Sequence, residues 1–143
     1  MGLFTGIFSS KGLDKKSDEH EIFFLTGDQQ YGVQVIVGER SQASLEALCG
    51  PRQAGGVKRV DTAWLLLEEE NSRYKNAVRV EIRGRQVGYL NSEAASRYRR
   101  LLAERNTPAA SGQCQAMITG GGVSSDGRKG LYEVWLDAPS LTQ

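Results

Sequence analysis

Residues 77–90 restrict the fold of this chain most, because they read as a complete β-hairpin. Apolar Val78, Val80 and Ile82 alternate with charged residues, which is the period of two that a half-buried strand requires. Gly84 follows soon afterwards and is suited to a tight turn, and residues 86–90 return as a second apolar strand. This region is therefore expected to form two paired strands joined by a tight turn.

Further strands and two helices are predicted around this hairpin. Ser41 at an N-cap and Gly50 at a C-cap predict a short helix between them. Asn91 or Ser92 is expected to cap a longer helix that runs to about residue 104. The other expected strands cover residues 21–26, 31–37, 60–67, 114–119 and 131–137. Many short strands with only two helices predict a mostly β fold, a small OB-like or SH3-like, partly open β-barrel.

The 143 residues suit a single domain. We expect residues 1–20 to be a flexible N-terminal tail, residues 21–139 to be the barrel domain, and residues 140–143 to be a short C-terminal tail. The first eight residues include the apolar pairs Leu3-Phe4 and Ile7-Phe8. Two interpretations of these pairs stay open: contact with a partner or a membrane surface, and a frayed terminus.

Several classes of function are disfavoured by what the sequence lacks. No apolar run approaches the roughly 20 residues of a membrane span, and the start does not have the pattern of a signal peptide, so a cytoplasmic location is expected. Cys49 and Cys114 match no zinc-ligand spacing, and His20 is the single histidine. No nucleophile, general acid or general base can be assembled from the motifs. We therefore expect no enzymatic activity, no metal and no cofactor.

The strongest functional signal is a local excess of basic residues. Residues 72–105 contain nine Lys or Arg against three Glu, although the whole chain has a net charge of only +1. Arg73, Tyr74 and Lys75 are consecutive in this region. An aromatic ring beside two cations is suited to stacking on a base while contacting phosphate. The alternative interpretation is a solvated basic sheet face beside a core tyrosine.

Four separated segments of the chain resemble the HIRAN domain family. Residues 71–98 read N-S-R-Y-K-N-A-V-R-V-E-I-R-G-R-Q-V-G-Y-L-N-S-E-A-A-S-R-Y, which is similar to the family signature N-P-Y-D-x-N-A-V-x-V followed by V-G-Y-L. Upstream, V-I-V-G-E-R-S-Q-A-S-L-E-A-L-C-G resembles the first strand and helix of stand-alone bacterial members. Downstream, A-M-I-T-G-G-G and G-L-Y-E-V-W-L-D-A-P resemble their C-terminal hairpin. The resemblance implies an OB-like barrel with two helices.

The resemblance also implies a function in DNA binding. Eukaryotic HIRAN domains bind single-stranded DNA and capture its free 3′ end, with the motif tyrosine stacked on the terminal base. Tyr74 matches that tyrosine. Lys75 stands where the family has an aspartate that accepts a hydrogen bond from the 3′-hydroxyl. An ammonium group has no acceptor for that proton and favours phosphate instead.

Two functional hypotheses follow. The first is a non-enzymatic nucleic-acid-binding module for single-stranded DNA or DNA ends, in which Tyr74 stacks on a base. The cations expected to contact phosphate in this hypothesis are Arg73, Lys75, Arg79 and Arg40. The alternative is a protein-interaction domain that retains the HIRAN-like fold but has lost DNA 3′-end recognition, because Lys75 replaces the aspartate.

Overall fold

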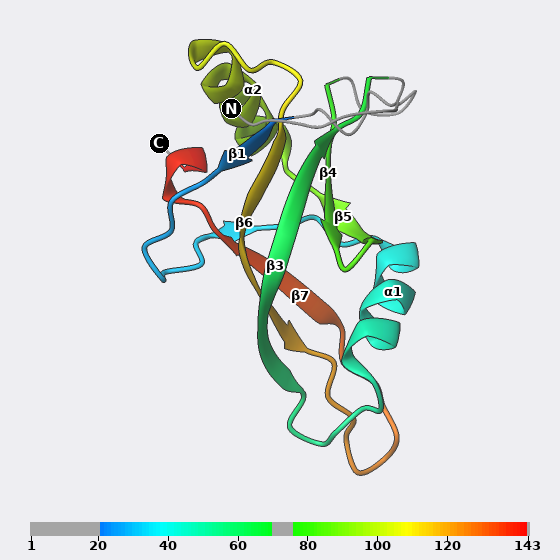
Figure 1. Cartoon of the computed structure of the whole chain (residues 1–143). Helices are drawn as coiled ribbons and strands as arrows, with labels where there is room; N and C mark the ends of the chain where they lie inside the picture. The colour runs from blue at the N-terminus through cyan, green and yellow to red at the C-terminus, as the bar shows by residue number, and fades with distance from the viewer. Residues whose placement is uncertain (1–20, 70–75, 143) are drawn as a thin grey trace, which may run out of the picture.

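The computed structural model describes residues 21–69 and 76–142 (Figure 1). Within them the chain forms a curled, mostly antiparallel sheet with two α-helices, so the predicted mostly β, partly open barrel is confirmed. The elements in chain order are β1 (Ile22–Phe24), β2 (Val33–Gln34), α1 (Glu39–Cys49), β3 (Val57–Leu67), β4 (Val78–Ile82), β5 (Arg85–Tyr89), α2 (Ser92–Glu104), β6 (Ser111–Gly120), β7 (Tyr132–Asp137) and the 3-10 helix η2 (Pro139–Leu141). No helix in these two ranges is long and apolar enough to cross a membrane.

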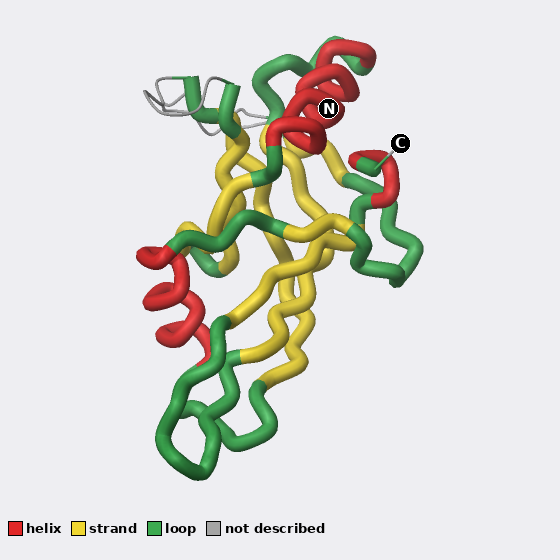
Figure 2. The backbone as a smooth tube through the Cα atoms, turned by 180° about the vertical axis from the view of Figure 1, so that it is seen from behind, coloured by secondary structure: helices red, strands yellow, loops and turns green. Residues whose placement is uncertain are grey.

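The long strand β3 joins the two halves of the sheet. The strand order is β2-β7-β6-β3-β4-β5, and β1 adds to β6 in parallel. β3 pairs with β6 from Val57 to Leu65 and with β4 from Ala63 to Leu67. One strand therefore passes from one half into the other, and the sheet curls as it does so (Figure 2). Residues that point into this curl form the core, among them Leu65, Val80 and Ile118, which are fully buried.

The two edges of the sheet meet at a single bridge. Just after β2, the Ile36 N–H donates to Tyr89 O at 2.8 Å, and the Tyr89 N–H donates back to Ile36 O at 3.0 Å. Gly88 makes this approach possible, since its φ is 150° and a Cβ there would lie 2.3 Å from Ile36 O. The β4–β5 register shifts beside it, between Val80 and Glu81. Such a bulge increases the local twist and turns β5 toward the opposite edge.

Helix α2 begins as the sequence predicts. The Asn91 side chain accepts a hydrogen bond from Ala94 N at 2.8 Å, which confirms the expected N-cap. The helix buries Tyr98 completely, and the phenol donates to Leu65 O and Ala110 O at 3.4 and 3.3 Å. Gly112 leaves room for that ring, because a Cβ there would lie 2.6 Å from the phenol oxygen. The helix is thus fixed against the end of β3 and the start of β6.

The predicted start of helix α1 is wrong. The helix begins at Glu39 with Gly38 at its N-cap, and the Gln42 N–H donates to Gly38 O at 3.1 Å. Ser41, expected at the cap, lies inside the helix and is buried. Gly38 takes the extended conformation that a cap needs, so helical hydrogen bonding starts earlier than the serine suggests. The end at Gly50 agrees with the prediction, since this glycine has a φ of 78°.

Gln42 attaches α1 to the sheet through a pair of hydrogen bonds. Its Nε2 donates to Tyr132 O at 2.9 Å, and its Oε1 accepts from Tyr132 N at 2.8 Å. We expect Gln42→Ala to lower the free energy of unfolding by about 1–3 kcal/mol, because the Tyr132 backbone loses both partners. Urea denaturation measures this loss. Gln115→Ala, at an exposed position of β6, is the matched control and should change stability by less than about 0.5 kcal/mol; equal losses in the two variants would contradict the expectation.

The chain remains packed beyond β7. Asp137 ends that strand as a buried carboxylate, which accepts hydrogen bonds from Asp28 N at 2.8 Å and from Gln29 N at 2.9 and 3.0 Å. In η2, Leu141 is buried, and its carbonyl accepts from Arg97 Nη1 at 3.2 Å. The domain boundary expected at residue 139 therefore falls inside a packed turn.

Candidate functional site

Three of the five predicted contact residues, Arg73, Tyr74 and Lys75, lie outside the described residues. Their segment connects β3 to β4, which are neighbours in the sheet. The described residues that flank this segment are Glu69 and Asn76.

Arg99 of α2 holds both sides of that segment. Its Nε donates to Asn76 O at 3.0 Å, and its Nη2 donates to Ala77 O at 3.2 Å. Its Nη1 lies 3.6 Å from Oε2 of Glu69 on the other side. Asn76 has a positive φ of 61°, which asparagine tolerates better than most residues. One guanidinium therefore contacts residues on both flanks of the segment and links them to α2, which lies at this end of the sheet (Figure 1).

Arg79 lies nearby on β4 between two carboxylates. Its Nη1 donates to Glu68 Oε2 at 2.7 Å, and its Nε donates to Glu81 Oε2 at 2.8 Å. Burial alone would lower the pKa of Arg79, but the hydrogen bonds to Glu68 and Glu81 raise it above its usual value. Tyr89 also donates to Glu68, at 3.2 Å, and burial together with the Glu68 charge raises the pKa of that phenol. A phosphate that binds Arg79 has to compete with these two carboxylates.

Arg40 lies on a different element from Arg79. It is an exposed residue in the first turn of α1, and α1 packs mainly against β5 and β7. The two predicted contacts therefore lie on separate elements, Arg40 on α1 and Arg79 on β4. Arg100 is a further exposed cation, and it lies on α2 beside Arg99.

The arginines of α2 are part of the basic excess in residues 72–105, and the charge pattern alone does not distinguish Arg99 among them. A usable signal is present: Ala95 lies one helical turn earlier on the buried side of α2, which places Arg99 toward the sheet. The partners of Arg79 were missed for another reason. Glu68 is 11 residues away in sequence and becomes a neighbour only through the β3–β4 pairing.

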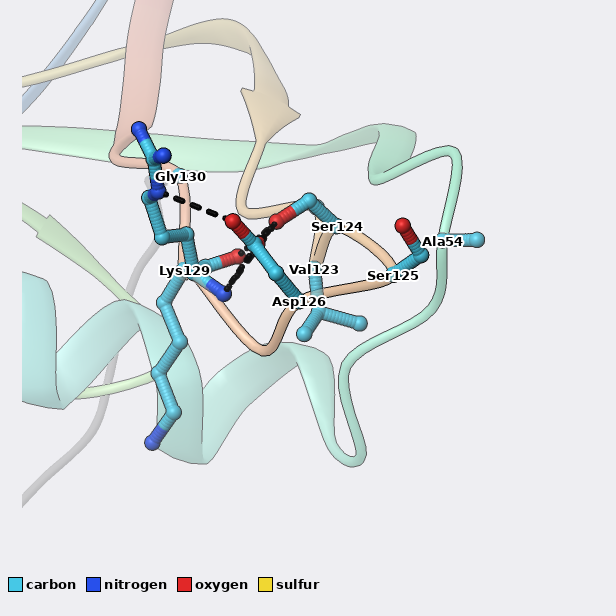
Figure 3. Close-up of a pocket in the computed structure, with 9 residues that line it drawn as sticks. Ala54, Val123, Ser124, Ser125, Asp126, Lys129 and Gly130 are labelled. Atoms are coloured by element: carbon cyan, nitrogen blue, oxygen red, sulfur yellow. Dashed lines mark hydrogen bonds and ion pairs between the residues drawn. The ribbon is translucent and has the colours of Figure 1, made fainter.

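An open pocket of about 580 Å³ lies at the other end of the molecule, between the loop that contains Ala54 and the β6–β7 loop (Figure 3). Asp126 points toward Ser124 there, and its carboxylate pairs with Arg128 at 3.1 Å. These hydrogen bonds lower the pKa of Asp126, that from Ser124 most strongly. They are contacts within one exposed hairpin loop. In the described part of the chain, no group of three or more His, Cys, Asp or Glu is arranged to hold a metal ion.

Comparisons with known proteins add no relative. No protein-family model, no curated protein and no solved structure matches this chain.

Proposed function

We propose that this chain is a HIRAN-like, non-enzymatic module of the cytoplasm that binds single-stranded DNA or DNA ends. In this proposal, Tyr74 stacks on a base, and Arg73 and Lys75 contact the adjoining phosphates. Arg79 becomes a contact when phosphate displaces one of its carboxylates, and Arg40 contacts a more distant part of the strand. Small β-barrels commonly bind single strands through their loops and strand faces, with aromatic rings as platforms for bases.

The observation that carries the proposal is the anchoring by Arg99. Stacking requires a ring held in a defined place, because each degree of freedom lost on binding reduces affinity. Arg99 donates to the Asn76 carbonyl and lies 3.6 Å from the exposed carboxylate of Glu69, on either side of the segment that bears Tyr74. The exposed Arg100 adds positive charge on the same helix. Cations beside an aromatic side chain are the combination that single-strand binding without sequence preference uses.

The test is fluorescence anisotropy with labelled oligonucleotides of about 10 nucleotides, a length typical of barrel binding sites. Tyr74→Ala should weaken binding by about tenfold or more, since base stacking contributes roughly 1–3 kcal/mol per base. Tyr74→Phe retains the ring and is the matched control, expected to stay within about twofold of the original chain. Affinity should fall steeply as salt rises. A 3′-phosphate should not weaken binding. Lys75 has no acceptor for the proton of a 3′-hydroxyl, but its positive charge can pair with a phosphate.

Absence of binding at low salt to strands with either a 3′-hydroxyl or a 5′-phosphate would refute the proposal. The protein-interaction alternative would then stand. Equal affinity of Tyr74→Ala and the original chain would instead place any nucleic-acid site elsewhere on the surface.

A further inference from the structure

The outer surface of β3, β6 and β7 carries two neighbouring rows of side chains, which we call the outer rows. In the first row, Val60 of β3 is paired with Met117 of β6, which is paired with Trp135 of β7. In the second row, Lys58 is paired with Thr119, which is paired with Glu133. The residues between them in sequence point inward, as the full burial of Ile118 and Val134 shows. Each row thus runs across the same three strands.

Solvent reaches this surface. Val60 is 52 % exposed, which is high for a valine on a central strand, and Lys58 and Glu133 are exposed. In Figure 1 the front of β3 is uncovered, with α2 at its upper end and α1 to its right. An apolar row of valine, methionine and tryptophan in the middle of a sheet face is unusual for a surface that contacts only water.

The second row carries one cation, Lys58, and one anion, Glu133. Within residues 21–69 and 76–142, neither Lys58 nor Glu133 has an ion-pair partner. They lie on the two strands that flank β6, at the same level along it. These positions suit a two-fold axis that runs parallel to β6, just above the outer surface. Such an axis places β3 of one copy opposite β7 of a second copy. Lys58 then faces Glu133 of the second copy, and Val60 faces Trp135 of the second copy.

The same axis places Met117 and Thr119 opposite Met117 and Thr119 of the second copy. The apolar row therefore meets an apolar row, and each cation meets an anion. This is the self-complementarity that an isologous dimer requires. Two sheets in such a dimer stack face to face at about 10 Å, the usual separation between packed sheets.

We propose that the outer rows bind a second copy of this chain, with the two-fold axis along β6. The proposal goes beyond nucleic-acid binding, because none of these six side chains belongs to the segment that bears Tyr74. The charge complementarity of Lys58 and Glu133 selects a second copy over an unrelated protein.

Sedimentation equilibrium over a concentration series tests the proposal. The original chain should shift from 15.7 kDa toward twice that mass as concentration rises. Val60→Glu should raise the dimer dissociation constant by about tenfold or more, because it places a carboxylate in the apolar row opposite Trp135. Ala103→Glu adds the same charge at an exposed position of α2 and should leave the dissociation constant unchanged. Val60 is exposed, so Val60→Glu and the control should have the same thermal melt at a concentration where both are monomeric.

A charge exchange tests the two-fold geometry. Lys58→Glu should weaken the dimer severalfold, because it sets two glutamates against each other. Glu133→Lys should do the same with two lysines. The double variant Lys58→Glu/Glu133→Lys should restore the original dissociation constant. A chain that stays monomeric up to its highest soluble concentration overturns the proposal, as does a dimer that Val60→Glu leaves unchanged. A double variant weaker than either single variant overturns the axis, and the proposal with it.

Discussion

Gly88→Ala should destabilise the protein by about 3 kcal/mol or more. Two penalties combine at Gly88. Its φ of 150° is one that residues with a side chain rarely adopt, and a Cβ would lie 2.3 Å from Ile36 O and 2.6 Å from Val35 Cγ1. Relief of this overlap requires β5 to move away from Ile36, which breaks the bridge that joins the two sheet edges. Urea denaturation measures the loss.

Gly84→Ala separates the two penalties. Gly84 also has a positive φ, of 77°, but no atom lies within 4 Å of its would-be Cβ. This variant should therefore lose only about 1 kcal/mol, the conformational part. In Gly88→Ala, hydrogen exchange of the Ile36 and Tyr89 amides should also accelerate, because their mutual hydrogen bonds open. Equal urea midpoints for the two variants would show that closure at Gly88 does not stabilise the barrel.

Asp137→Asn should lower the free energy of unfolding at neutral pH by about 2 kcal/mol or more. The buried carboxylate binds the backbone N–H groups of Asp28 and Gln29, and an amide cannot accept all of these hydrogen bonds. Burial alone would raise the pKa of Asp137, but the hydrogen bonds from Asp28 and Gln29 hold it below its usual value. The charged form is therefore the one that the fold stabilises.

The difference in free energy of unfolding between the original chain and Asp137→Asn should decrease as pH falls. Because the folded pKa lies below the unfolded value of about 3.9, the stabilisation is complete above that value and is lost as pH falls through the folded pKa. Denaturation curves at pH 7 and at pH values below about 4 should show the gap narrowing. Asp126→Asn, in an exposed loop, is the control and should show a much smaller gap. A gap that stays constant, or widens in acid, would contradict this role for Asp137.

The sequence predicts the individual strands of this chain better than it predicts how the two edges of the sheet join. Alternation at Val78, Val80 and Ile82 correctly places β4, since side-chain period is a local property. The bridge between Ile36 and Tyr89 joins residues far apart in the chain, and no local pattern indicates it. In the sequence, Gly88 looks like an ordinary residue of an apolar strand. Only the contact between β5 and Ile36 shows that a side chain would not fit at this position.

The candidate site likewise has features that local sequence predicts and features that depend on tertiary contacts. Motif and charge point to the segment that contains Tyr74, because residue types and their order are local information. The role of Arg99 depends on how α2 packs against the ends of β3 and β4, which is a tertiary property. The carboxylates around Arg79 are equally tertiary, and they show that a cation counted as free in the sequence can already be paired in the fold.

Amide chemical shifts during titration with a short single-stranded oligonucleotide test the proposed function most directly, because they report where the strand binds. The account predicts that the largest changes cluster at Glu69, Asn76, Ala77 and Arg99, on either side of the segment that bears Tyr74. The Lys58 and Val60 amides of β3 should change little. No changes at the first group, or changes confined to the outer rows, would contradict the account.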